Sequence, residues 1–159
     1  MRDEASVILL VEDSEEDFQT VSRLLGKIAP QNVERCPDAP AAIDYLDEVA
    51  KNGPGSARRW PSVILLDLNL PGEDGRSLLV RLKRDERFRR IPVVILTTSG
   101  NPRDLEYCYS NGAAGYITKP VDLANFRSSL EHMTNYWLRA VTLPPAGVVH
   151  DGSSTAPKD

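Results

Sequence analysis

The sequence has few of the residues that mark secreted, membrane-bound or cysteine-liganded metal proteins. Of its 159 residues only two are cysteines, Cys36 and Cys108. They are far apart and lack the spacing of a zinc or redox motif, so we expect free thiols. No apolar run approaches the roughly 18 residues of a membrane span. The apolar run near the N-terminus stops in acids and has no cleavage site for a signal peptide. These absences predict a cytoplasmic protein without a membrane partner.

Positive charge is also in short supply. Nineteen lysines and arginines face 23 acids, which gives a formal net charge of -4. Such a chain binds nucleic acid poorly without specific contacts. One basic run, residues 81–90, is interrupted by Asp85 and Glu86 and falls at the expected end of a helix, where cations favour the helix dipole. We therefore interpret it as a solvated face and expect no nucleic-acid partner.

What the chain does contain is a regular alternation of strand and helix patterns. Five short runs rich in β-branched residues predict strands: 6–11, 33–36, 62–67, 91–99 and 115–119. Apolar residues at helical spacing predict helices between and after them: 14–28, 38–52, 74–88, 102–113 and one that begins after Asp122. Continuous apolar strands that alternate with helices are typical of an α/β fold, a doubly wound parallel sheet with helices on both faces.

The expected domain organisation is simple. A single domain over residues 1–140 suits the chain length. The extension at 141–159 carries three prolines, Pro144, Pro145 and Pro157, and a Gly/Ser-rich stretch near its end. We expect it to be partly disordered, or to act as an arm that reaches a second protomer.

Polar side chains stand where four of the predicted strands end. Glu12 and Asp13 follow the first strand, Asp67 ends the third, Thr97 lies near the end of the fourth, and Lys119 ends the fifth. In a doubly wound sheet, ligands bind at the carboxyl ends of the strands. These side chains are therefore expected to share one site.

The chemistry of that set is restrictive. Like charges in one site repel and raise at least one pKa, whereas a hard divalent cation such as Mg²⁺ takes oxygen ligands and removes the conflict. Glu12, Asp13 and Asp67, with the backbone carbonyl of Asn69, are the predicted ligands. Such a metal beside Lys119 suits a phosphoryl group. A carboxylate can itself be the nucleophile and form an aspartyl-phosphate, and Asp67 is the candidate.

Each residue alone has an ordinary interpretation. Glu12 and Asp13 could be acids at a helix start, and Asp67 could cap a turn. Thr97 could be a strand residue and Lys119 a surface lysine. Their occurrence together, at the carboxyl ends of four separate strands, favours a functional site.

The motifs that carry these residues resemble a known family. "LLVEDS", "LLDLNLPGEDG", "PVVILTTS" and "YITKP" are similar to the receiver domains of two-component response regulators, over roughly residues 6–138. "DLNLPGEDGR", "LTTS" and "YWLRAVTLP" further resemble the small stand-alone regulators that pair with bacterial phytochromes. The resemblance implies a flavodoxin-like sheet with strand order 2-1-3-4-5.

The resemblance also implies roles for individual residues. Asp67 would accept phosphate from a sensor histidine kinase, with Mg²⁺ as cofactor, and Lys119 would pair with the phosphoryl group. Thr97 would reorient towards it, and Tyr116 would turn inward as the switch residue. Lys119 and Pro120 would form a cis peptide bond. The domain would catalyse only its own slow phosphorylation and dephosphorylation.

Asn69 and Ser99 flank the predicted site at positions that would steer the attacking water, so we expect them to tune dephosphorylation. No DNA-binding segment is recognisable after the domain, so output would go through a partner or a homodimer. The last helix, strand five and helix four offer that contact, with the C-terminal extension. Alternatively, the bulky residues of the last helix only cover the sheet and the C-terminal extension.

Two other functional classes remain open at this point. One is a Mg²⁺-dependent phosphatase or phosphotransferase of the aspartyl-phosphate type, which usually has a second aspartate two residues after the nucleophile. Here that position is Asn69. The other is an adaptor that does not respond to phosphate.

Overall fold

The fold is a parallel five-stranded sheet between two layers of helices. The computed structural model describes residues 7–27, 33–53, 57–119 and 122–144. The sheet has the order β2-β1-β3-β4-β5, and every paired strand is parallel. The predicted doubly wound architecture and strand order are therefore confirmed. The elements in chain order are β1 (Val7–Val11), α1 (Glu15–Gly26), β2 (Val33–Cys36), α2 (Ala39–Asn52), β3 (Pro61–Leu66), α3 (Gly75–Arg84), β4 (Val93–Thr97), α4 (Pro102–Ser110), β5 (Gly115–Thr118) and α5 (Leu123–Asn135).

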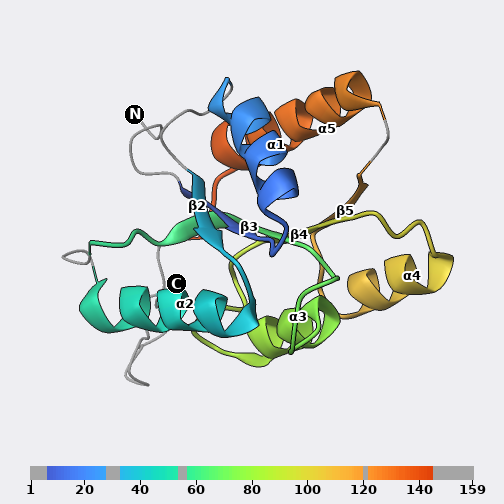
Figure 1. The fold of residues 1–159 in the computed structure, drawn as a ribbon. Helices are drawn as coiled ribbons and strands as arrows, with labels where there is room; N and C mark the ends of the chain where they lie inside the picture. Colours follow the sequence, from blue (N-terminus) through green and yellow to red (C-terminus); the bar gives the residue numbers. More distant parts are fainter. Residues whose placement is uncertain (1–6, 28–32, 54–56, 120–121, 145–159) are drawn as a thin grey trace, which may run out of the picture.

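The helices divide between the two faces of the sheet. In Figure 1, α1 and α5 lie together on one side, and α2, α3 and α4 lie on the other. The three central strands are buried on both faces, as their continuous apolar sequences predict. Alternate strand residues enter two separate cores. Leu9, Ile64 and Ile95 pack under α2 and α3, whereas Ile8, Leu65 and Leu96 pack under α1 and α5.

Side-chain caps explain where most of the helices begin. Each of the five N-cap residues accepts a hydrogen bond from a backbone N–H of the first turn, which satisfies a donor without a partner inside the helix. The caps are Ser14, Asp38, Asp74, Asn101 and Asp122. At the other end of α2, the backbone of Gly53 has φ +57°, the left-handed geometry that glycine adopts without strain.

Several predicted boundaries are wrong. The helix expected over 74–88 ends at Arg84, and a turn follows in which Phe88 is buried against Trp60. The fourth strand covers only Val93–Thr97, and α4 ends at Ser110, three residues early. Local pattern could not give the end of α3, because a sequence does not show whether a buried apolar residue such as Phe88 lies in a helix or in the turn after it.

The last helix does not run uniformly to its end. After α5, a π-helix covers Tyr136–Ala140. The wider turn lets the neighbouring Trp137 and Leu138 both pack against the core beneath α1 and α5. Tyr136 instead stays 52% exposed and meets Trp137 edge to face.

The predictions about the cysteines and membrane spans can be compared with the structure, whereas those about Pro120 and most of the C-terminal extension cannot. Both cysteines are free and buried, as expected. Within the described ranges, no helix is long and apolar enough to cross a membrane. Pro120, and with it the predicted cis bond, lies outside the described residues, as do residues 145–159 of the C-terminal extension.

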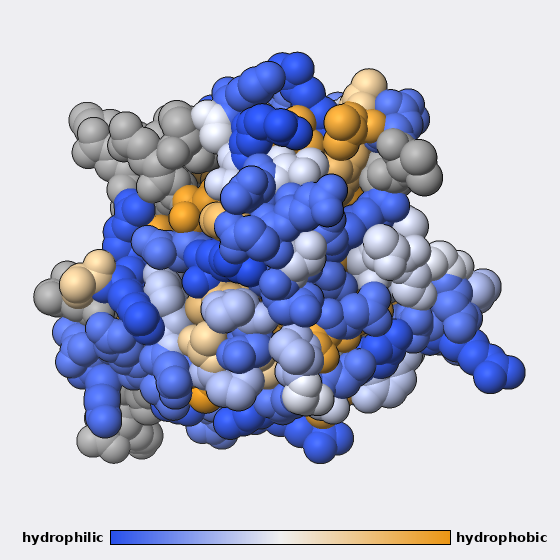
Figure 2. Space-filling model, in the orientation of Figure 1, coloured by the Kyte–Doolittle hydropathy of each residue, from blue (hydrophilic) through white to orange (hydrophobic). Residues whose placement is uncertain are grey.

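The surface seen in Figure 2 is mostly hydrophilic, with hydrophobic residues in the recesses between elements. Among the five α-helices of the described residues, α4 carries the most exposed large hydrophobic residues. Cys108 is its single buried residue, while Leu105, Tyr107 and Tyr109 are 42%, 43% and 50% exposed. This helix therefore contributes little to the core and presents large apolar side chains to the solvent.

Candidate functional site

Backbone hydrogen bonds extend the sheet by one residue at the carboxyl ends of the strands. The N–H of Glu12 donates to the carbonyl of Cys36 (3.1 Å), and that of Asp67 donates to Val11 (3.0 Å). The N–H of Lys119 donates to the carbonyl of Thr97 (2.7 Å). The residues that carry the polar side chains are thus fixed by the sheet itself, even though they follow the strands.

Lys119 is the centre of the site. Its Nζ donates to Oε2 of Glu12 at 2.7 Å, to Oδ2 of Asp67 at 2.9 Å and to Oδ2 of Asp17 at 2.9 Å. Burial alone would lower the pKa of this ammonium, but the hydrogen bonds to the three carboxylates raise it above its ordinary value. Lys119 therefore remains charged at any physiological pH and supplies one fixed positive charge to the site.

Burial and a neighbouring carboxylate disfavour the charged form of the Glu12 side chain. This side chain is 1% exposed, and burial followed by the contact with Asp67 raises its pKa from 4.5 to about 7, against the opposing effect of Lys119. Its Oε1 also accepts the N–H of Ser14 at 3.1 Å. Three carboxyl groups thus converge on a single ammonium, and a bound cation would relieve the repulsion among them.

The structure brings Asp17 into the site and leaves Asp13 at its margin. Oxygens of Glu12, Asp17 and Asp67 lie within 4.8 Å of one another. Asp13 is exposed, and its backbone carbonyl accepts a hydrogen bond from Arg35. Sequence reasoning missed Asp17 because this residue lies in the first turn of α1 and does not directly follow a strand. The available signal was its position three residues after the cap Ser14, which turns it back towards the end of β1.

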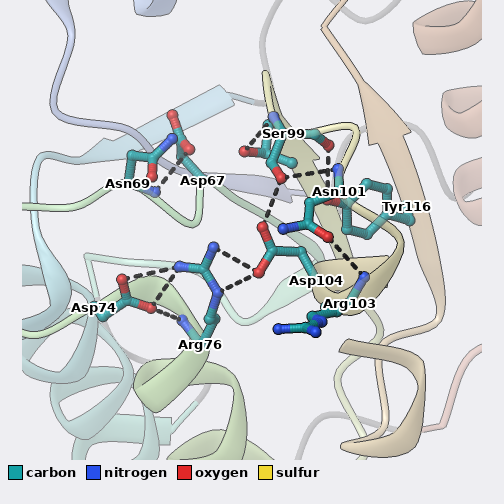
Figure 3. Close-up of polar contacts among 10 residues, drawn as sticks. Asp67, Asn69, Asp74, Arg76, Ser99, Asn101, Arg103, Asp104 and Tyr116 are labelled. Carbon is teal, nitrogen blue, oxygen red and sulfur yellow. Dashed lines mark hydrogen bonds and ion pairs between the residues drawn. The ribbon is translucent and has the colours of Figure 1, made fainter. Parts of the chain in front are cut away.

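The donor set fits a hard cation. Three carboxylates converge, two of them almost buried, and no histidine or cysteine belongs to the group found among the described residues. Oxygen ligands of this kind suit Mg²⁺, Mn²⁺ or Ca²⁺ rather than zinc. The Oδ1 of Asp67 accepts the N–H of Asn69 at 3.0 Å, which orients the carboxylate at the rim (Figure 3).

Thr97, Ser99 and Tyr116 form a second group beside the carboxylates. Thr97 is completely buried, and its Oγ1 accepts the N–H of Ser99 at 3.3 Å. The hydroxyl of Tyr116 donates to the carbonyl of Ser99 at 2.8 Å. Partial burial of the Tyr116 ring raises the pKa of its hydroxyl. Ser99 thus connects the end of β4 directly to the aromatic side chain of β5.

A third group extends from Ser99 to the starts of α3 and α4. The Oγ of Ser99 donates to Oδ2 of Asp104 at 2.6 Å, and the guanidinium of Arg76 donates to Oδ1 of Asp104 at 2.8 Å. Figure 3 shows Arg76 between Asp104 and Asp74, which it also contacts through a salt bridge of 3.0 Å. The Ser99 hydroxyl and then Arg76 lower the pKa of Asp104. No sequence motif indicated this connection.

The chain is similar to known proteins over most of its length. The sequence model of the response regulator receiver domain matches residues 8–131. Response regulator Rcp1 of Synechocystis is 38% identical over 152 residues, which cover 92% of this chain and 100% of Rcp1.

Two solved structures are similar over most of the chain. The phosphorylated cyanobacterial phytochrome response regulator RcpA is 37% identical with a TM-score of 0.76, over 87% of this chain and 98% of RcpA. The Mn²⁺-bound form of Rcp1 is 38% identical with a TM-score of 0.75, over 87% of this chain and 99% of that one. The flavodoxin-like receiver fold is thereby confirmed.

Proposed function

Because this chain belongs to the response regulator receiver family and is similar to phytochrome response regulators, we propose that it accepts a phosphoryl group on Asp67. The observation that carries the proposal is the position of this carboxylate. It is almost buried and held from two sides, by Lys119 at 2.9 Å and by the N–H of Asn69 at 3.0 Å. A nucleophile that is already oriented lowers the activation barrier, because the entropic cost of orienting it has been met before the reaction.

The chemistry would be a single displacement. An oxygen of Asp67 attacks phosphorus, a new O–P bond forms, and the bond from phosphorus to the donor breaks, with the electron pair leaving on the donor. Lys119 would stay within reach of the phosphoryl oxygens and offset their charge. Hydrolysis would be a second displacement, in which a water oxygen attacks phosphorus and the Asp67 carboxylate is the leaving group. This slow self-catalysed cycle is the extent of the enzymatic activity that we propose.

We propose Mg²⁺ as the cofactor. Glu12, Asp13 and Asp67 would hold it with the backbone carbonyl of Asn69, and Asp17 would retain Lys119 beside it. In this division Asp17, which lies with Glu12 and Asp67 in the structure, keeps its 2.9 Å contact with Lys119. The exposed Asp13 carboxylate has no partner among the described residues and would complete the ligand set. The metal would polarise the phosphoryl oxygens during transfer. The Mn²⁺-bound structure of Rcp1 supports a divalent cation in this class of protein.

Phosphorylation would act on the surface through Thr97 and Tyr116. A phosphoryl group adds about -1.5 to -2 charges and strong acceptor oxygens. The hydroxyl of Thr97 would turn towards it and leave the N–H of Ser99, whose carbonyl holds the Tyr116 hydroxyl. Asn69 and Ser99, on either side of Asp67, would tune the rate of hydrolysis. The change would be read on α4, β5 and α5.

A cytoplasmic histidine kinase is the partner that we propose as phosphodonor, and the similarity to Rcp1 and RcpA favours a phytochrome kinase. The domain over residues 1–140 would act as a stand-alone regulator. The exposed apolar residues of α4 support a homodimer through α4, β5 and α5, with the extension at 141–159 as an added arm.

The direct test is phosphorylation by acetyl phosphate with Mg²⁺, read as a mass increase of the intact protein. We expect the wild-type protein and Asp44→Asn, an exposed substitution on α2, to gain one phosphoryl group. Asp67→Asn should gain none. Phosphorylation of Asp67→Asn to the wild-type extent would reject Asp67 as the acceptor.

A further inference from the structure

Helix α4 is attached to the site by one polar side chain. Among the described residues, Asp104 is the one residue of α4 whose side chain makes hydrogen bonds to other parts of the fold. Its two oxygens are both engaged, Oδ2 by Ser99 and Oδ1 by Arg76. Since Cys108 is the single buried residue of the helix, packing alone holds α4 weakly. Its position therefore depends strongly on the contacts of Asp104.

Arg76 anchors this carboxylate to the opposite helix. Its Nε and Nη2 both lie 2.8 Å from Oδ1 of Asp104, and its Nη1 contacts both oxygens of Asp74, the cap of α3, at 3.1 and 3.0 Å. A planar guanidinium that binds one carboxylate through two of its nitrogens and both oxygens of another carboxylate has little freedom to rotate. The arrangement joins the starts of α3 and α4 at the edge of the site, as Figure 3 shows.

The hydroxyl of Ser99 is held by Asp104, which Arg76 holds in turn. It donates to Asp104 at 2.6 Å, a short hydrogen bond to a charged acceptor. Its single proton is then unavailable to any other acceptor. At the same time the backbone of Ser99 receives the Tyr116 hydroxyl and donates to Thr97. Whatever moves Asp104 therefore moves the residue on which Thr97 and Tyr116 both depend.

We propose that Arg76 and Asp104 are positioning residues that hold the Ser99 hydroxyl away from the phosphoryl site and so prolong the phosphorylated state. This inference rests on the proposed phosphorylation of Asp67. Without the latch formed by Arg76, Asp104 and Ser99, the Ser99 hydroxyl is free to hydrogen-bond the attacking water. The latch also fixes α4, so the lifetime of the phosphoryl group and the position of the exposed apolar side chains are set by the same contacts.

The test measures the loss of phosphate from protein that was phosphorylated with acetyl phosphate and Mg²⁺ and then freed of donor. We expect Asp104→Ala to lose phosphate about ten-fold faster, the effect of one hydrogen bond to a charged acceptor at the low end of its usual strength. Arg76→Gln should change the rate in the same direction, and Arg76→Lys, which keeps the charge, by less. Arg103→Gln is the matched control, since this neighbour on α4 is exposed and its guanidinium makes no hydrogen bond or ion pair among the described residues.

A double variant separates the latch from general destabilisation. If Asp104 acts through the Ser99 hydroxyl, Ser99→Ala combined with Asp104→Ala should lose phosphate at the rate of Ser99→Ala alone. An equal acceleration by Asp104→Ala in both backgrounds, or none in either, overturns the inference. Asp104→Asn preserves the shape of the side chain and provides a second measurement if the alanine variant folds poorly. Absence of phosphorylation in the wild-type protein would instead overturn the proposed function.

Discussion

Replacing Gly75 with alanine is a severe test of how the site is held. Gly75 begins α3, and its N–H donates to the carbonyl of Leu68 at 3.0 Å. A Cβ at this position would clash with the carbonyl oxygen of Asp67, and it would lie 2.7 Å from the Cα of Leu68 and 3.0 Å from the carbonyl carbon of Asp67. All three are backbone atoms, so no side chain can rotate away from the contact. The backbone that carries the proposed phosphoacceptor must move.

The expected magnitude follows from these contacts. Carbon atoms pack at about 3.5–4.0 Å, so relief requires a displacement of about 1 Å between α3 and the Asp67 backbone. Overpacking of this kind costs about 1–3 kcal/mol, and Gly75→Ala should lie near the upper limit because all three contacts are with backbone atoms. The better helix propensity of alanine offsets up to about 1 kcal/mol. We therefore expect a loss of about 2 kcal/mol in the free energy of unfolding.

The assay compares urea unfolding and phosphorylation of Gly75→Ala with those of Gly26→Ala. Gly26 ends α1, and a Cβ added there meets no atom of the described residues within 4 Å, so its substitution should be neutral or stabilising by up to about 1 kcal/mol. Gly75→Ala should also phosphorylate more slowly, because a misplacement of about 1 Å can lower a rate about 100-fold. Wild-type stability and wild-type phosphorylation in Gly75→Ala would refute the reasoning.

Three further results are expected. The folded pKa of Glu12, about 7, exceeds its ordinary 4.5, so the folded state binds the proton more tightly. Stability without metal should therefore fall as pH rises through this window, and the gain in melting temperature with Mg²⁺ should be larger at pH 8 than at pH 5. Thr97→Ala should still be phosphorylated, but amide chemical shifts around Tyr116 should no longer respond, since the Thr97 hydroxyl is the proposed link. Phe88→Ala should lower the free energy of unfolding by about 3–5 kcal/mol in urea, because Phe88 is 1% exposed; an effect below about 1 kcal/mol would contradict its assignment to the core.

The sheet and most of the site geometry could be predicted from two things. One is the local pattern of apolar residues, and the other is the rule that the carboxyl ends of parallel strands meet at one edge of the sheet. Apolar runs ending in Glu12, Asp67 and Lys119 placed these side chains at a common edge, and the structure brings them into contact around the lysine. The strand ends are set by the ladder of backbone hydrogen bonds, which is insensitive to the identity of distant residues.

The remaining features depend on how elements are placed relative to one another. Asp17 enters the site because of the rotation of α1 about its axis, and a difference of one residue would turn it to solvent. Arg76 and Asp104 are 28 residues apart, and they meet only because α3 and α4 lie on the same face of the sheet. Phe88 is buried in a turn, a position whose burial no periodicity marks.

The division of the interior into two cores has a consequence for how such a protein changes over evolutionary time. Among the described residues, the core beneath α2 and α3 shares no buried residue with the core beneath α1 and α5. Substitutions that share no contacts and lie more than about 7–10 Å apart have nearly additive effects on stability. One layer can therefore accumulate replacements without compensating changes in the other, while the edge that carries Asp67 stays anchored to strands held by both. The molecule can be remodelled on one side at a time.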